Sequence, residues 1–282
     1  MRRFDTVISA DELLGNLDHR DWRIVDCRFD LMAPGKGYED FLSGHIPGAV
    51  YANLDTDLAG PIRRDSGRHP LPDLDQFAAT LGRWGISNHC QVIAYDYASG
   101  ALAARLWWML RWLGHADIAV LNGGIAAWLR AGGRLQEGPT TAETAQFTAR
   151  PDATRILNTA ELALHPHTIR MIDARDRQRF RGLAEPIDAV AGHIPGARNL
   201  PFSELLGPDG RFLPAADLQE RLLGVLGDAP ARPWAAMCGS GVTACHLALA
   251  AEIARFTGPR LYVGSWSEWI RDPARPVATG ND

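Results

Sequence analysis

Short runs of apolar residues alternate along the chain with longer segments in which apolar residues recur at helical spacing. Runs of about four to six residues, rich in Val, Ile and Ala, predict buried strands. The clearest are 23–28, 91–96, 170–175 and 234–238, and the clearest helices are expected at 72–82 and 214–224. This alternation predicts the α/β class, with mostly parallel sheets and helices on both faces.

The sequence also repeats itself. The hexapeptide Gly-His-Ile-Pro-Gly-Ala occurs at 44–49 and again at 192–197. The same landmarks recur around it in the same order. A capped helix start and a strand ending in Asp-x-Arg precede the hexapeptide. Two helices with a strand between them follow it, and then a short strand, a Gly turn and a Trp. The distance between copies is too long for a solenoid, so it indicates a duplicated domain. We expect a first domain over 1–137, a linker over 138–154 and a second domain over 155–282.

The two copies differ where their second strand ends. Ligands of such sheets bind beyond the carboxyl ends of the strands, where a helix begins. In the second copy this place reads Cys238-Gly-Ser-Gly-Val-Thr243, whereas in the first copy Asp96 stands where the cysteine would be. The duplication therefore predicts two similar domains but a single reactive site.

The residue types in the cysteine loop point to nucleophilic chemistry. Gly239 and Gly241 allow backbone N–H groups to turn into a cup, and the following helix N-terminus favours negative charge. We therefore expect Cys238 to be largely a thiolate at neutral pH and to act as a nucleophile. The alternative is a buried structural cysteine, which the flanking glycines and the strand-end position disfavour.

With its repeat, its Asp/Cys asymmetry and the loop Cys238–Thr243, the chain resembles the two-domain rhodanese-type sulfurtransferases over nearly its whole length. The resemblance implies two tandem rhodanese-like domains, the first inert and the second catalytic. It implies that a small donor leaves its sulfur on Cys238 as a persulfide, and that a thiophilic acceptor such as cyanide, a small thiol or thioredoxin removes it. It implies no cofactor, and no His, Cys or Glu cluster in the sequence suggests a metal.

The loop also bears on the identity of the donor. In the family that this chain resembles, the cysteine loop of thiosulfate enzymes is similar to Cys-Arg-Lys-Gly, and that of mercaptopyruvate enzymes is similar to Cys-Gly-Ser-Gly. Gly239 and Ser240 therefore favour 3-mercaptopyruvate as the donor. In the relay proposed for the family, Ser240 passes a proton to the leaving group, and His69 and Asp57 support it. The alternative for His69 is a loop histidine at the domain interface. The other loop residues expected to contact the donor are Gly241, Val242 and Thr243.

A carboxylate donor requires cations. Arg179 matches the family's substrate-binding arginine and can form a bidentate pair. The second arginine of animal mercaptopyruvate enzymes is absent from the stretch Glu185-Pro-Ile-Asp188, and Arg181 is a candidate substitute. The missing cation leaves thiosulfate open as the alternative donor. Arg175 follows the strand residue Asp173 and is expected to form a structural pair.

Several other polar residues are expected to be structural. His45 and His193 lie in the repeated hexapeptide, and because the inert copy keeps it, we interpret the motif as architectural. Cys245 lies two helical turns after Cys238, where a resolving thiol or a core position are the alternatives. Cys27 and Cys90 are expected in the core or at strand ends.

Composition restricts the partners. The net charge is −4 and the isoelectric point about 6.1, so we expect neither nucleic acid nor an anionic membrane to be bound. No apolar run has the length of a signal peptide or a membrane span. Four cysteines in 282 residues fit a reducing cytoplasm. A monomer is expected, because the duplication already supplies the interface that a dimer would give.

Two rival functions remain open. A phosphatase of related fold needs Cys-x5-Arg to clamp a phosphoryl group, but Ala244 stands six residues after Cys238. The non-enzymatic alternative is a rhodanese-like binding or redox-sensing module, against which the intact glycine loop argues.

Overall fold

The structure, a computed structural model, describes residues 3–164, 168–227 and 233–280. The chain forms two compact units. The first unit comprises 1–60, 72–152 and 207–212, and the second unit comprises 61–71, 153–206 and 213–282. The segment 61–71, which the first half of the sequence encodes, thus clusters with the second half. It brings Arg68 and His69 into the unit that carries Cys238.

The first unit is built on a parallel five-stranded sheet in the order β1-β5-β4-β2-β3. Its strands are β1 (Val7–Ile8), β2 (Trp22–Asp26), β3 (Val50–Tyr51), β4 (Gln91–Tyr95) and β5 (Ile118–Leu121). Its helices are α1 (Ala10–Leu14), α2 (Lys36–Ser43), α3 (Leu74–Arg83), α4 (Ala103–Trp112) and α5 (Gly124–Arg130).

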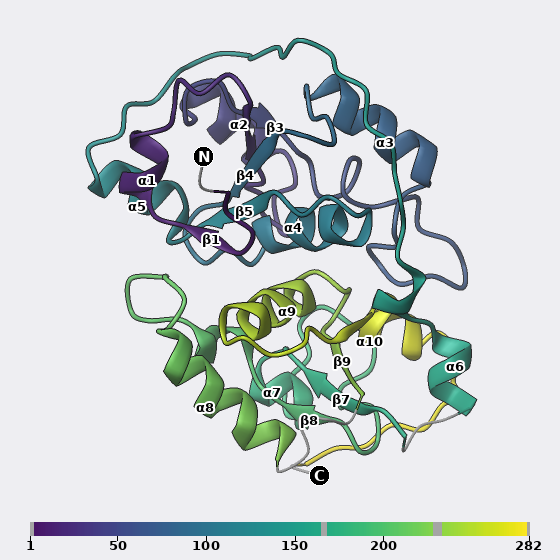
Figure 1. Ribbon diagram of the computed structural model, residues 1–282. Coiled ribbons are helices and arrows are strands. Elements are labelled where there is room, and N and C mark those ends of the chain that lie inside the picture. Colours follow the sequence, from purple (N-terminus) through teal and green to yellow (C-terminus); the bar gives the residue numbers. More distant parts are fainter. Residues whose placement is uncertain (1–2, 165–167, 228–232, 281–282) are drawn as a thin grey trace. The chain divides into compact units, whose positions relative to one another are not determined.

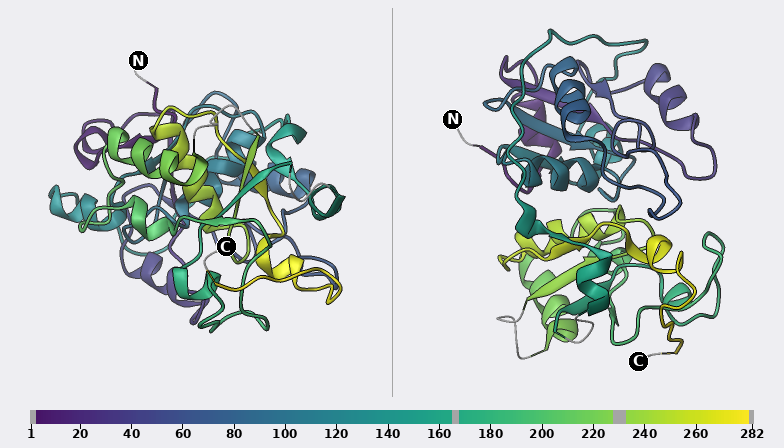
Figure 2. Two further views of the ribbon diagram at one scale, coloured as in Figure 1. Left: turned by 90° about the horizontal axis from the view of Figure 1, so that it is seen from below. Right: turned by 90° about the vertical axis from the view of Figure 1, so that its right-hand side faces the viewer.

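The second unit repeats this topology, with a parallel sheet in the order β6-β10-β9-β7-β8. Its strands are β6 (Ile156–Leu157), β7 (Arg170–Asp173), β8 (Arg198–Asn199), β9 (Trp234–Met237) and β10 (Arg260–Tyr262). Its helices are α6 (Thr159–Leu164), α7 (Arg177–Phe180), α8 (Ala215–Leu226), α9 (Thr243–Ile253) and α10 (Ser265–Trp269), with 3-10 turns at Ala153–Arg155 and Phe202–Leu205. The predicted α/β class, with a helix-flanked parallel sheet in each half, is confirmed (Figures 1 and 2).

Each sheet is buried on both faces, as its continuous apolar strands require. On β4, Ile93 and Tyr95 join a core cluster with residues of α1, α2 and α5. The alternate residues Val92 and Ala94 are equally buried, and α4 packs against β4 and β5. In the second unit, α9 packs against β9 and β10, while Met237 joins the cluster that contains Trp266 of α10.

The repeated Asp-x-Arg and hexapeptide motifs work together as a structural clamp. Arg28 pairs with Asp26 at 2.7 Å and donates to the carbonyl of Gly44, which opens the hexapeptide, at 2.8 Å. The second unit has the same arrangement, with distances of 2.7 and 2.6 Å, in Asp173, Arg175 and Gly192. The expected structural pairing of Arg175 is therefore confirmed.

The hexapeptide histidines are also used alike in both units. His45 stacks on Phe41 with ring centroids 4.0 Å apart, and His193 stacks on Phe180 at 3.7 Å. Each Nδ1 lies 2.8 Å from the backbone oxygen of the same phenylalanine. Both rings are fully buried, which supports the architectural interpretation of the motif.

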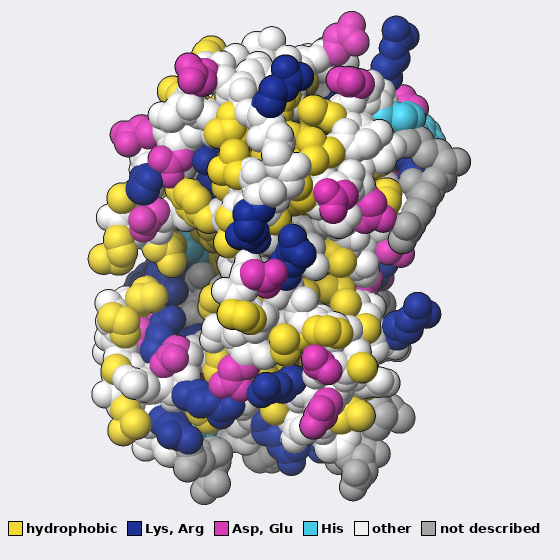
Figure 3. All heavy atoms as spheres, turned by 90° about the vertical axis from the view of Figure 1, so that its left-hand side faces the viewer, with side chains coloured by type: hydrophobic (Ala, Val, Ile, Leu, Met, Phe, Trp, Pro, Cys, Tyr) yellow, Lys and Arg dark blue, Asp and Glu magenta, His cyan; other side chains and the backbone are white. Residues whose placement is uncertain are grey.

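The described residues include no helix long and apolar enough to cross a membrane. Within the same ranges, no group of three or more His, Cys, Asp or Glu side chains is arranged to hold a metal ion. On the face shown in Figure 3, basic and acidic side chains are interspersed, in keeping with the modest net charge of −4.

Candidate active site

Cys238 follows β9 directly and stands at the carboxyl edge of the second sheet. Its Sγ accepts a hydrogen bond from the backbone N–H of Gly241 at 3.1 Å, and its own N–H donates to Ser265 Oγ at 3.1 Å. The backbone oxygen of Cys238 accepts from the N–H of Trp266 at 3.0 Å, so the first turn of α10 fixes the loop. The residue is 2% exposed. The sulfur is thus held in a backbone cup before the start of α9, an environment that stabilises negative charge.

The two loop glycines serve different purposes. Gly241 has a φ of 78°, and a Cβ there would lie 2.4 Å from the carbonyl oxygen of Val263, so only glycine permits this turn. At Gly239, a Cβ would lie 2.9 Å from Nη2 of Arg68 and 3.4 Å from Nη2 of Arg179. Gly239 therefore leaves space for two guanidinium groups beside the cysteine loop.

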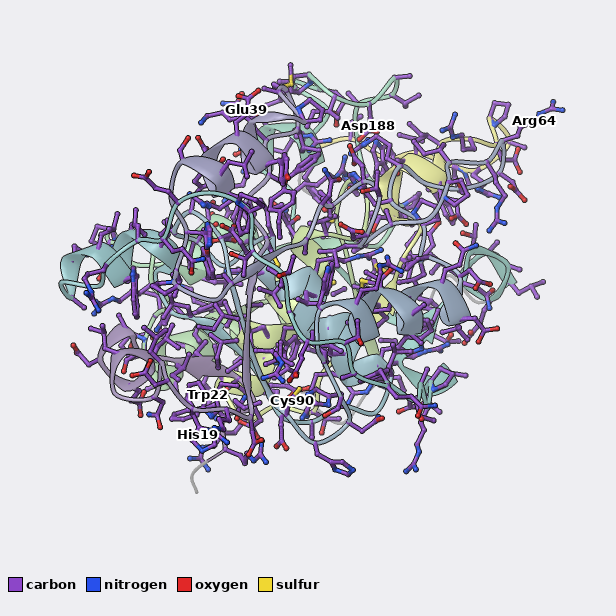
Figure 4. The ribbon with its side chains drawn as sticks, turned by 90° about the horizontal axis from the view of Figure 1, so that it is seen from above. His19, Trp22, Glu39, Arg64, Cys90 and Asp188 are labelled. Atoms are coloured by element: carbon purple, nitrogen blue, oxygen red, sulfur yellow. The ribbon has the colours of Figure 1, made fainter. Side chains whose placement is uncertain are left out.

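In the first unit, the loop that corresponds to the cysteine loop surrounds the side-chain carboxylate of Asp96. Trp22 begins β2 and Cys90 directly precedes β4, and Figure 4 labels both residues. Asp96 directly follows β4 and therefore lies at the other end of these parallel strands. The Asp96 carboxylate accepts hydrogen bonds from the backbone N–H groups of Gly100 and Leu102, each at 2.9 Å, and from two further ones. The loop that donates the Gly241 N–H to the Cys238 sulfur in the second unit thus corresponds to a loop that surrounds a carboxylate with N–H donors in the first.

We expect Asp96→Ala to destabilise the first unit by about 3 kcal/mol, because buried N–H donors would lose their acceptor. Differential scanning calorimetry should show the midpoint of thermal unfolding falling by several degrees. Asp18→Ala, which removes an exposed carboxylate from the same unit, should leave it unchanged. An Asp96→Ala midpoint equal to that of the wild type would contradict a structural role for this carboxylate.

Ser240 and His69 meet in the second unit. Ser240 Oγ lies 2.7 Å from His69 Nδ1, and the two residues are 6% and 5% exposed. The backbone N–H of Arg68 donates to Ser267 Oγ at 3.1 Å, which holds the segment carrying His69. Two members of the predicted relay are thus within hydrogen-bonding distance. Asp57 belongs to the first unit, where its carboxylate accepts from the N–H of Asn53 at 2.8 Å, and its participation stays a prediction.

A chain of alternating charges surrounds the loop on the side of Gly239. Nη2 of Arg179 lies 2.8 Å from Oε1 of Glu185 and 2.9 Å from Oδ2 of Asp188. Asp188 also pairs with Arg68, and Glu185 contacts Arg175 at 3.4 Å. Burial lowers the pKa of Arg68, whereas the nearby Cys238 sulfur acts in the opposite direction.

Arg68, Glu185 and Asp188 are members of this cluster that no sequence motif predicts. Arg68 directly precedes His69 and lies far along the chain from Glu185 and Asp188, so the proximity of the three residues depends on tertiary structure. Arg181, proposed as a second cation, is the C-cap of α7, and its side chain is exposed. Arg68, rather than Arg181, stands beside Arg179 at the loop.

The remaining loop residues shape the start of α9. Val242 is the N-cap of this helix and is 5% exposed, and Thr243 is its first residue. Cys245 is fully buried, and its Sγ donates to the carbonyl oxygen of Gly241 at 3.2 Å. Cys245 thereby supports the loop from the core side.

The two α/β units share one topology, and at the same place in it the second unit has Cys238 in a glycine turn and the first unit has the buried Asp96. The family model for the rhodanese-like domain matches residues 9–131 and 158–272. The chain belongs to the rhodanese-like family, of which it contains two tandem domains.

Individual relatives extend this similarity over nearly the whole chain. A protein of Pseudomonas aeruginosa named "Probable 3-mercaptopyruvate sulfurtransferase" is 47% identical, with 98% of each chain covered. The thiosulfate sulfurtransferase of Gallus gallus is 36% identical, with 88% of this chain and 86% of that protein covered. The crystal structure of the 3-mercaptopyruvate sulfurtransferase SseA from Escherichia coli has a TM-score of 0.82 at 31% identity, covering 94% of this chain and all of that one.

Proposed function

We propose that this protein is a sulfurtransferase that takes a sulfane sulfur from 3-mercaptopyruvate as a persulfide on Cys238 and gives it to a thiophilic acceptor. The observation that carries the proposal is the Cys238 sulfur in its backbone cup, beside the guanidinium groups of Arg68 and Arg179. The names of the relatives support the activity, and they include both 3-mercaptopyruvate and thiosulfate enzymes.

In the first step, the Cys238 thiolate attacks the sulfur of the donor. A new S–S bond forms, and the C–S bond breaks with its electron pair moving to carbon, which produces the enolate of pyruvate. The proton of the donor's thiol group ends on this carbon, and Ser240 with His69 can carry it there. The products are pyruvate and a Cys238 persulfide, whose terminal sulfur the cup's N–H groups stabilise as an anion.

In the second step, an acceptor attacks the terminal sulfur of the persulfide. With cyanide, a C–S bond forms, the S–S bond breaks, and its electron pair returns to Cys238 as the thiolate. The products are thiocyanate and the starting enzyme. Because each step is a displacement at sulfur, the residues already described are sufficient for the cycle. A small thiol or thioredoxin would accept the sulfur in the same way.

Ser240→Ala should lower kcat/KM with 3-mercaptopyruvate by about 100-fold and change it little with thiosulfate. The reason is that the pyruvate enolate needs a proton, whereas thiosulfate releases sulfite without one. Thiocyanate formation from each donor measures the effect. Thr80→Ala, which removes a buried hydroxyl from α3 in the first unit, is the matched control and should affect both donors alike. Equal losses with the two donors in Ser240→Ala would contradict proton transfer through this hydroxyl.

The proposal extends to the setting of the reaction. We place the protein in the cytoplasm, which is supported by its four free cysteines, none of them joined in a disulfide. We also propose that it acts as a monomer, because the chain already contains the domain twice. A redox-sensing module is the second candidate, and it would leave Cys238 without sulfur after incubation with either donor.

A further inference from the structure

Asp188 bridges the two arginines at the cysteine loop. It lies on the connection between α7 and β8, where Figure 4 labels it. One carboxylate oxygen pairs with Arg68 and the other contacts Arg179 Nη2 at 2.9 Å. The Asp188 side chain is only 5% exposed, whereas those of Arg68 and Arg179 are 23% and 15% exposed. The bridge is therefore shielded from water, and both arginines remain partly accessible.

The loop that carries Asp188 is itself fixed. Glu185 Oε1 accepts hydrogen bonds from the backbone N–H groups of Ile187 at 3.1 Å and Asp188 at 3.0 Å. Glu185 also pairs with the buried Arg175 and with Arg179, which ties the first end of this turn to two cations. The Asp188 carboxylate is consequently held in place before any donor arrives.

Both arginines keep N–H groups directed to the cysteine loop. Nη2 of Arg68 and Nη1 of Arg179 lie 2.9 and 3.6 Å from the position of a Cβ on Gly239. Among the described residues, neither of these two atoms makes a hydrogen bond, since the recorded bonds of the two side chains use Nη1 of Arg68 and Nε and Nη2 of Arg179. These groups can donate to an anion placed next to Cys238.

The cluster as a whole carries no net charge. Three guanidinium groups face three carboxylates, in Arg68, Arg175, Arg179, Asp173, Glu185 and Asp188. A donor with one negative charge is attracted by the nearby N–H groups and repelled by Asp188. A donor with two charges meets twice the attraction and twice the repulsion at the same distance, so the Asp188 carboxylate subtracts more from the binding of a doubly charged donor than from that of a singly charged one. Water screens this effect little, because Asp188 is buried.

We propose that Arg68 and Arg179 jointly bind the anionic end of the sulfur donor, and that Asp188 sets a preference for a donor with one negative charge over a donor with two. The inference rests on the proposed function and specifies its donor class. A 2-oxo acid such as 3-mercaptopyruvate carries one charge through its carboxylate, and thiosulfate carries two. Arg68 supplies the second cation that the stretch Glu185–Asp188 lacks.

The test compares both donors in Asp188→Asn, which keeps the volume of the side chain and removes its charge. We expect the ratio of kcat/KM for thiosulfate to that for 3-mercaptopyruvate to rise about tenfold at low ionic strength. The ratio cancels any loss of arginine positioning that affects the two donors equally. Glu220→Gln removes one exposed charge from the same unit and should leave the ratio unchanged.

A second variant, Arg68→Gln, tests the cation independently. Its KM should rise at least about tenfold for both donors, since one of two donor-binding guanidinium groups is gone. An unchanged donor ratio in Asp188→Asn, or an unchanged KM in Arg68→Gln, would overturn the inference while the sulfurtransferase activity stands. Wild-type protein that forms thiocyanate from neither donor would instead refute the proposed function.

Discussion

Cys238→Ser should abolish sulfur transfer, with a loss of at least about 10,000-fold in thiocyanate formation from either donor. A serine hydroxyl at this place can still accept the N–H of Gly241, so the loop should keep its shape. It cannot form a persulfide, because the reaction requires a polarisable thiolate that both attacks sulfur and leaves it again. The fold should survive, as circular dichroism and thermal unfolding would show.

Cys90→Ser is the matched control for this loss. Cys90 is also buried, and its Sγ donates to the carbonyl of Ser87 at 3.3 Å, which a serine hydroxyl can do as well. Burial raises the pKa of the Cys90 thiol, so it should stay protonated and unreactive. This variant should therefore retain full activity. Comparable losses in the two variants would show that the effect is structural and not specific to Cys238.

Arg179→Gln should lower kcat/KM by about 100-fold with either donor, mainly through KM. The glutamine removes a charged partner for the donor. It also leaves Glu185 and Asp188 with one cation fewer, so we expect a lower midpoint of thermal unfolding as well. Initial rates of thiocyanate formation over a range of donor concentrations measure the kinetic effect.

Arg177→Gln separates the function of Arg179 from the general loss of an arginine on α7. Arg177 lies on the same helix but pairs with Glu204 at 2.7 Å, and its side chain is 48% exposed. Surface pairs of this kind contribute little to stability. The variant should therefore keep the wild-type KM. If Arg177→Gln raised KM as much as Arg179→Gln, a specific role for Arg179 in donor binding would be untenable.

The fold was predictable because its signals are local. Apolar runs at 91–96 and 234–238 correspond to β4 and β9 within about one residue, since buried parallel strands require such runs. The recurrence of the hexapeptide at 44–49 and 192–197, among landmarks in the same order, predicts the duplication. The glycines around Cys238 are also informative, because a position with a positive φ, such as that of Gly241, favours glycine and is therefore visible in the sequence.

Contacts between distant segments were not predictable in the same way. The pairing of Arg68 with Asp188 joins residues 120 positions apart, and no periodicity or motif indicates it. The assignment of 61–71 to the second unit likewise depends on contacts such as that of Arg68 N with Ser267 Oγ. Arg181 at the end of the short helix α7 is exposed, and its contact with the donor stays a prediction.

The central claim is that Cys238 carries the transferred sulfur, and intact-protein mass spectrometry tests it most directly. Wild-type protein would be incubated separately with 3-mercaptopyruvate and thiosulfate, freed of excess donor and weighed beside Cys238→Ser. The account predicts a gain of about 32 Da, one sulfur atom, that is absent from Cys238→Ser and is removed by cyanide. No gain with either donor, or a gain that persists in Cys238→Ser, would contradict it.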